Sequence, residues 1–166
     1  MMSVALPQGD LALLETDAAR ELLGSRELAR LAYVAPDGTP RLFPMLFHWN
    51  GTELVMSTFA GSRKIDALRA RPDVAVTIDT AGPPPVLLQL RGRVEVTDVE
   101  GIVPEYAMAQ RHYYGDEMAE MGLAQIDRPG LRMARIAFRP AWVGLVDFMT
   151  RFPGGATADE FAQRGR

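Results

Sequence analysis

Two turn signals enclose one apolar stretch of the chain, and together they restrict the fold more than any other feature. The first, PDGT at positions 36–39, combines a proline that presets φ with a glycine that accepts positive φ. The second, NG at positions 50–51, is the strongest short hairpin signal. We therefore expect a β-meander with strands at residues 28–35, 41–49 and 53–58.

The middle strand of this meander is apolar on both faces. Because successive side chains of a strand point to opposite sides, one face carries four apolar residues and the other carries three. An antiparallel strand with one wet face would alternate with polar residues instead. We expect the second apolar face to be shielded from water, either by a helix of the same chain or by another subunit. The two faces consist of Phe43, Met45, Phe47 and Trp49, and of Leu42, Pro44 and Leu46.

The rest of the chain continues the pattern of short strands with helices between them. Alternation predicts strands at 73–79 and 86–97 and two closing strands at 131–138 and 142–148. Helices are predicted at 17–23, from 62 to about 71 and at 104–114, and segment 115–130 stays unassigned. We expect a mainly β fold with flanking helices, a six- or seven-stranded antiparallel barrel. A single domain should span residues 1–166, with a helical lead at about 10–25, the barrel at about 28–148 and a polar tail at 153–166.

Composition excludes several classes of site. The 166 residues include no cysteine, so disulfides, thiolate nucleophiles and cysteine-based metal sites are excluded. His48 and His112 are the two imidazoles, and we expect no metal site. The net charge of −3 favours neither nucleic acid nor an anionic membrane as a partner. The first ten residues do not read as a signal peptide, and no apolar run matches a membrane span, so a cytoplasmic location is expected.

One segment has the residue types of an anion site. A strand that ends in Ser57 and Thr58 is followed by a loop with glycine and by a predicted helix that begins with Ser62, Arg63 and Lys64. Helix N-termini present unpaired N–H groups to phosphate, hydroxyls add donors, and the two cations add a forked and a point contact. The alternative is a plain helix cap with two solvated cations.

Three stretches carry a resemblance to a known family. They are RLFPMLFHW at 41–49, SRKIDALRARPDVAV at 62–76 after the hydroxyl-ended strand, and LQLRGRVEV at 88–96. Over about residues 28–148 the chain resembles the pyridoxamine 5′-phosphate oxidase-like FMN-binding split-barrel superfamily. This resemblance implies a split β-barrel, and a homodimer with two cofactor sites at its interface. A second subunit would explain the doubly apolar strand.

The resemblance also implies a set of cofactor-binding residues. Ser57, Thr58, Arg63 and Lys64 would hold the phosphate, with Ser62 as a further donor at the helix start. The backbone from Pro44 through Met45 to Leu46 would lie along the ring system. Gln89 would contact the ring or its ribityl chain. Trp142 would approach the cofactor from the partner chain, or else serve as a core or interface aromatic.

These expectations lead to three hypotheses about the function. The first is an FMN-dependent oxidoreductase acting on an unknown small molecule, for which the sequence identifies no catalytic residue. The second is a reductase that uses a deazaflavin coenzyme, although Leu46 stands where such relatives often have tryptophan. The third is a non-enzymatic flavin- or haem-binding module, in which His48 or His112 would be the axial ligand. The tail at 154–166 lacks the basic pattern that holds pyridoxamine phosphate, so vitamin B6 oxidation is not expected.

Overall fold

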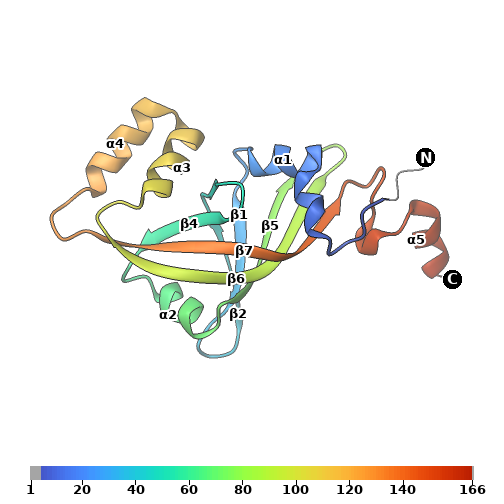
Figure 1. Ribbon diagram of the computed structural model, residues 1–166, viewed down its shortest axis with the longest axis horizontal. Helices are drawn as coiled ribbons and strands as arrows, with labels where there is room; N and C mark the ends of the chain where they lie inside the picture. The colour runs from blue at the N-terminus through green and yellow to red at the C-terminus, as the bar shows by residue number, and fades with distance from the viewer. Residues whose placement is uncertain (1–4, 166) are drawn as a thin grey trace.

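The fold is one antiparallel sheet of seven strands that is flanked by helices (Figure 1). The computed structural model describes residues 5–165. The strands are β1 (Ala29–Val34), β2 (Pro40–Met45), β3 (His48–Trp49), β4 (Leu54–Phe59), β5 (Asp73–Thr80), β6 (Val86–Glu100) and β7 (Arg132–Val146). They are hydrogen-bonded in the order β2-β1-β5-β6-β7-β4-β3. This arrangement confirms the predicted mainly β split barrel with flanking helices.

The predicted strand at 41–49 is wrong, because the structure divides it into β2 and β3. These two strands follow each other in the chain but lie at opposite edges of the sheet: β2 pairs with β1, and β3 pairs with β4. The chain crosses from one edge to the other at Leu46 and Phe47, and Phe47 is buried there with 3 % exposure. Continuous apolarity conceals this bend, because residues 42–47 are all apolar although only Met45 and Phe47 among them are buried.

The second apolar face of β2, which carries Leu42 and Pro44, is not covered by a helix within residues 5–165. Leu42 is 65 % exposed and Pro44 is also exposed, so a helix of the same chain, the first of the two predicted covers, is wrong for these two residues. Pro40 and Pro44 fit here because β2 is an edge strand, where a missing N–H costs no ladder bond. A second subunit as the cover remains a prediction.

The two predicted closing strands are one strand, β7, that contains a bulge. Arg91 pairs with Trp142 and Gly92 pairs with Pro140, so Ala141 is an extra residue in β7. The β7 residues that belong to the core therefore switch across the bulge from even numbers (134, 136 and 138) to odd numbers (143 and 145). Proline at residue 140 suggested a strand end, but a bulge tolerates it equally well.

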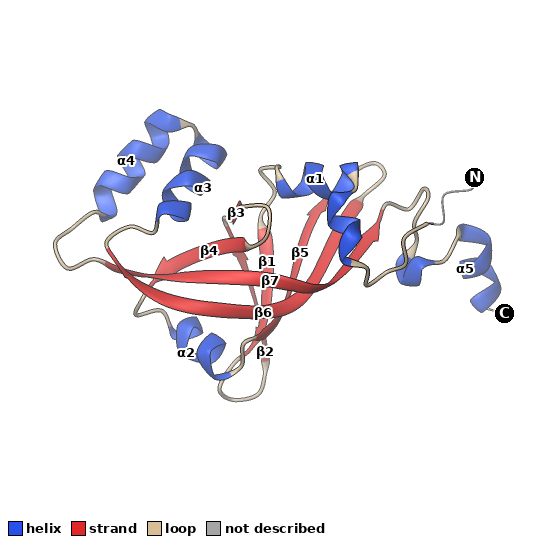
Figure 2. Ribbon diagram, viewed as in Figure 1, coloured by secondary structure: helices blue, strands red, loops and turns tan. Residues whose placement is uncertain are grey.

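Five α-helices surround the sheet in the described part of the chain (Figure 2). They are α1 (Asp17–Leu23), α2 (Arg63–Ala70), α3 (Pro104–Tyr114), α4 (Asp116–Ile126) and α5 (Ala158–Arg164), with 3-10 turns at Leu11–Glu15 and Pro153–Gly155. Helices α3 and α4 form a hairpin inserted between β6 and β7, and this hairpin and α5 lie at opposite ends of the molecule (Figure 1). No helix within residues 5–165 is long and apolar enough to cross a bilayer.

Local signals explain most of these helices. Thr16 caps α1 by accepting a hydrogen bond from the N–H of Ala19. Helix α4 occupies the unassigned segment: Gly115, with φ of +80°, separates it from α3, while Gly122 stays inside it. Helix α5 lies in the segment that was predicted only as a polar tail, and Thr157 and Glu160 form a capping box at its start.

The core lies between the sheet and helices α1 and α2. Its largest fully buried side chains come from five strands (β1, β4, β5, β6 and β7), from α2 and from the first 3-10 turn. Those from α2 place its first turn against the barrel wall. Among these side chains are Phe138, Leu31, Met56, Ile65, Leu68, Leu90 and Ile136. The position of α2 in the core determines where its N-terminal cations lie.

Candidate functional site

The side chain of Lys64 is a buried cation at the start of α2. It is the only lysine of the chain, and it is 9 % exposed. Its Nζ atom lies 3.4 Å from the centroid of the Phe43 ring on β2, an attractive cation–π contact. No ion pair among residues 5–165 involves Lys64, and burial lowers the pKa of its amine below the usual 10.5. An anion bound here would supply the charge that the surrounding residues lack.

Lys64 lines a cavity of about 550 Å³ between α2, β1 and the β1–β2 turn. Arg63 and Arg41 also line it, together with two carboxylates, those of Asp37 and Asp66. Arg41 is already paired, since its Nη2 lies 3.2 Å from Oδ2 of Asp37. Hydrogen bonds from the Thr39 hydroxyl and backbone N–H, aided by Arg41, lower the pKa of Asp37 to about 2. Arg63 and Lys64 therefore remain as the cations available to a ligand.

The predicted hydroxyls lie elsewhere. None of Ser57, Thr58 and Ser62 lines the cavity of Lys64, and the Ser62 side chain makes no capping bond to α2. Ser57 and Thr58 are neighbours in β4, so their side chains point to opposite faces of the sheet. The two hydroxyls therefore point away from each other, and their part in binding a phosphate stays a prediction.

Ser57 faces the α3 side of the sheet. It pairs with Arg135 of β7, and partners in an antiparallel ladder point to the same face. Arg135 donates hydrogen bonds to Oε1 of Glu105 at the start of α3, with the Nη2 atom at 2.6 Å. The Ser57 hydroxyl is buried in this region with no hydrogen-bond partner in the described structure. The Arg135–Glu105 pair fixes α3 against β7, and Arg135 lowers the pKa of Glu105.

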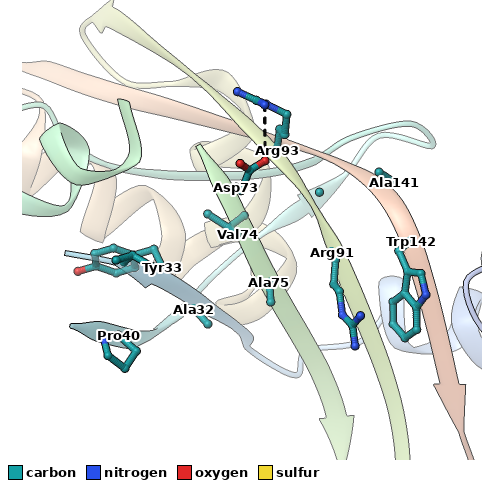
Figure 3. A pocket seen from close by; sticks show the side chains of 12 residues that line it. Ala32, Tyr33, Pro40, Asp73, Val74, Ala75, Arg91, Arg93, Ala141 and Trp142 are labelled. Atoms are coloured by element: carbon teal, nitrogen blue, oxygen red, sulfur yellow. Dashed lines mark ion pairs between the residues drawn. The ribbon is translucent and has the colours of Figure 1, made fainter. Parts of the chain in front are cut away.

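Gln89 and Trp142 form a second group on the outer face of the sheet, on β6 and β7. They line a smaller cavity of about 210 Å³ together with Arg91. The Arg91 guanidinium lies 4.0 Å from the centroid of the Trp142 ring, so the two side chains stack. Figure 3 shows them side by side and pointing the same way from the neighbouring strands. Trp142 is half-buried, and it lies at the surface of the fold and not in the core.

A shallow groove connects the two cavities. Tyr33 lines both the groove and the cavity of Lys64, while Arg91 and Trp142 line both the groove and the smaller cavity (Figure 3). The floor of the groove comes from the outward small side chains of β1 and β5, Ala32 and Ala75. A flat or elongated molecule can therefore contact both groups across the sheet.

The remaining predicted residues lie around the edge strand. Pro44 is exposed on β2, Met45 is 7 % exposed in the core, and Leu46 is half-buried in the crossing to β3. The sequence placed Arg91 on the same face as Gln89 by alternation, and it was a possible further cation for a longer, anionic deazaflavin coenzyme. Tyr33 was not singled out, and nothing in the sequence indicated it.

No group of three or more His, Asp or Glu side chains within the described residues is arranged to hold a metal ion. His112 is engaged in a structural contact, because its Nε2 atom lies 2.9 Å from the carbonyl oxygen of Ser25. His48 is half-buried on β3 near Glu105, at the α3 end of the sheet.

Comparisons with known proteins concern the fold and the family. The solved structure of an F420 reductase matches 75% of this chain and 94% of its own, with 27% identity and a TM-score of 0.58. A conserved hypothetical protein from Mycobacterium tuberculosis matches 89% of this chain and 90% of its own, with 20% identity and a TM-score of 0.62. A heme binding protein from Mycobacterium smegmatis matches 79% of this chain and 53% of its own, with 18% identity and a TM-score of 0.56. The last two likenesses concern the fold alone.

No curated protein sequence matches the chain. The pyridoxamine 5′-phosphate oxidase family, in contrast, matches residues 15–146. This range includes all seven strands, the whole lining of the Lys64 cavity and the part of the smaller cavity that β6 and β7 form. The chain therefore belongs to the pyridoxamine 5′-phosphate oxidase family.

Proposed function

We propose that the chain is a flavin-binding oxidoreductase that holds FMN by its phosphate and acts on a small molecule. The observation that carries this proposal is the Lys64 ammonium, which is 9 % exposed and has no acidic partner in residues 5–165. A buried charge is costly unless it is paired, so a site that retains one fits an anionic ligand. Arg63 at the mouth of the same cavity adds the forked contact that suits a phosphate.

The cofactor site is proposed to be completed by two copies of the chain. The edge strand β2 above Lys64 and the strand β7 that carries Trp142 are separated by four strand spacings, or about 19 Å along the sheet. In a homodimer that buries Leu42 and Pro44, the ring of a cofactor held at Lys64 would meet Gln89 and Trp142 of the other copy. The exposed apolar face of β2 supports this arrangement, because a lone subunit would leave it in water.

The residues of the chain would bind and orient the cofactor. FMN, when bound, supplies hydride and one-electron chemistry, which needs no protein nucleophile. Lys64 and Arg63 would neutralise the phosphate, the backbone of Pro44 to Leu46 would lie along the ring, and Trp142 would shield it from water. The absence of cysteine from the chain is consistent with redox chemistry that the cofactor supplies and that needs no thiolate nucleophile.

The absorbance spectrum of the purified protein and a titration with FMN test the proposal. Yellow colour that survives dialysis is expected, and Lys64→Ala should weaken FMN binding by roughly 10- to 100-fold because one charge-assisted contact is lost. Arg69→Ala is the matched control on the same helix, since Arg69 pairs with Asp98 at 2.8 Å and should leave FMN affinity unchanged. Equal FMN affinity of the wild type and Lys64→Ala would refute the phosphate site, and a Soret band would indicate the haem-binding alternative.

A deazaflavin-dependent reductase is the second candidate. The 27% identity with an F420 reductase over 75% of the chain favours it. In that case the purified protein should be colourless and should quench the fluorescence of added deazaflavin coenzyme, and Lys64→Ala should weaken this quenching. Tight FMN that the coenzyme does not displace would exclude this candidate.

A further inference from the structure

The cavity of about 210 Å³ beside Trp142 contains a cation that the phosphate site does not use. We propose that this cavity is the substrate subsite and that it takes a small aromatic carboxylate, whose carboxylate group is bound by Arg91. The inference rests on the proposed function in one respect, namely that a substrate in this cavity would lie beside the ring of the cofactor. Binding of the carboxylate itself depends only on the residues of the cavity.

Arg91 lies against Trp142 and has no acidic partner in the described part of the chain. Its guanidinium stacks 4.0 Å from the centroid of Trp142, and no ion pair involves it in residues 5–165. Stacking uses the flat face of a guanidinium and leaves the N–H donors in its plane free for a forked contact with a carboxylate. Arg93 on the same strand is different, since its Nη1 atom lies 3.6 Å from Oδ1 of Asp73 (Figure 3).

Two glycines fix the Trp142 ring that holds Arg91. An added Cβ atom at Gly9 would lie 2.8 Å from Nε1 of Trp142, and one at Gly144 would lie 2.5 Å from Cη2. The indole therefore occupies space that only glycine leaves open, between the N-terminal segment and β7. A backbone bond from the N–H of Gly9 to the carbonyl oxygen of Val143, at 2.7 Å, holds that segment in place. The position of Arg91 is thus preset before any ligand arrives.

The walls and the size of the cavity indicate an aromatic body. Leu87, Val146 and Phe148 supply apolar surface, and the exposed amide of Gln89 adds a donor and an acceptor. The volume exceeds the roughly 150 Å³ of a protein cavity that holds benzene, so one ring with a carboxylate fits. Arg91 is the one cation that lines this cavity within the described residues, which suits a singly charged carboxylate better than a doubly charged phosphate.

Calorimetric titration of the purified full-length protein with sodium benzoate and with neutral benzamide tests the inference. We expect benzoate to bind at least tenfold more tightly than benzamide. Arg91→Ala should weaken benzoate by roughly 10- to 100-fold, because a hydrogen-bonded charge pair is lost. Arg91→Lys should retain part of the affinity, since it keeps the charge without the fork. Arg93→Ala, the matched control on the same strand and face, should bind benzoate like the wild type.

Three results would overturn the inference: equal binding of benzamide and benzoate, equal losses in Arg91→Ala and Arg93→Ala, or an undiminished affinity of Arg91→Ala for benzoate. An FMN titration of the same variants separates this inference from the proposed function. If the wild type binds benzoate but not FMN, the cofactor proposal fails and the subsite stands. If Arg91→Ala loses FMN affinity and keeps benzoate affinity, Arg91 belongs to the cofactor and the subsite is wrong.

Discussion

Replacing Gly92 by alanine is expected to destabilise the fold by about 2 kcal/mol, because β6 and β7 approach each other too closely there for a side chain. An ideal Cβ atom at Gly92 would lie 2.1 Å from the carbonyl oxygen of Arg139 and 3.2 Å from the backbone nitrogen of Ala141. Both are backbone atoms of the bulge, so no flexible side chain can move aside. To bring the distance of 2.1 Å even to 3.0 Å, below which Cβ contacts essentially do not occur, the two strands must separate by about 1 Å.

The magnitude follows from two opposing effects. Forcing extra volume into a packed site costs roughly 1–3 kcal/mol, and a backbone clash belongs at the upper end of this range. Alanine recovers about 0.5–1 kcal/mol, because glycine loses more conformational freedom on folding. For a chain of this length the net change corresponds to a melting temperature lower by about 4–8 °C.

Urea and thermal unfolding followed by circular dichroism measure the effect. The matched control is Gly61→Ala, since an added Cβ atom there meets nothing within 4 Å and the backbone does not have positive φ. This control should unfold within about 0.5 kcal/mol of the wild type. If Gly92→Ala is equally harmless, the close approach at the bulge is refuted, together with the argument that glycine is required there.

Two further predictions concern titration and packing. Affinity for FMN should fall as the pH rises through the lowered pKa of Lys64, because only the protonated amine attracts phosphate. The variant Lys64→Arg keeps its charge, so its affinity for FMN should show no such fall in the same pH range. Reductive ¹³C-methylation followed by NMR gives the Lys64 pKa, because the chain has no other lysine and the Lys64→Arg variant identifies the signal of the N-terminal amine. An unshifted Lys64 value would contradict the burial argument. Tyr113, whose pKa burial raises to about 12, donates a hydrogen bond of 2.7 Å to the carbonyl oxygen of Glu27. Tyr113→Phe should cost about 1 kcal/mol in urea unfolding, whereas Tyr114→Phe, 55 % exposed, should cost nothing measurable.

Local sequence determined the turns and most of the helix starts. Gly38 and Gly51 adopt φ of +81° and +97° at the two predicted turns, and Thr16 caps α1 as an isolated signal would suggest. These features depend on the residues within a few positions of one another, so they can be read without the fold. The mainly β architecture followed from them, together with the alternation of apolar residues.

Two features of the fold depend on pairing between strands that are far apart in the chain, and the local sequence does not indicate them. The crossing at Leu46 and Phe47 exists because β2 and β3 pair with different strands, and the extra residue Ala141 exists because of the register between β6 and β7. The local sequence of a strand does not indicate which other strand it pairs with, or in which register.

The candidate site shows the same division. The sequence placed Arg63 and Lys64 at a helix start and Gln89 on an outward face, which identified the residue types and the anion they suit. Only the packing of α2 against the barrel buries Lys64 over Phe43, and only the β6–β7 register brings Arg91 onto Trp142. Charge and hydrogen-bonding capacity belong to single residues and are visible in the sequence. Burial and stacking arise between residues far apart in the chain, so the tertiary structure alone determines them.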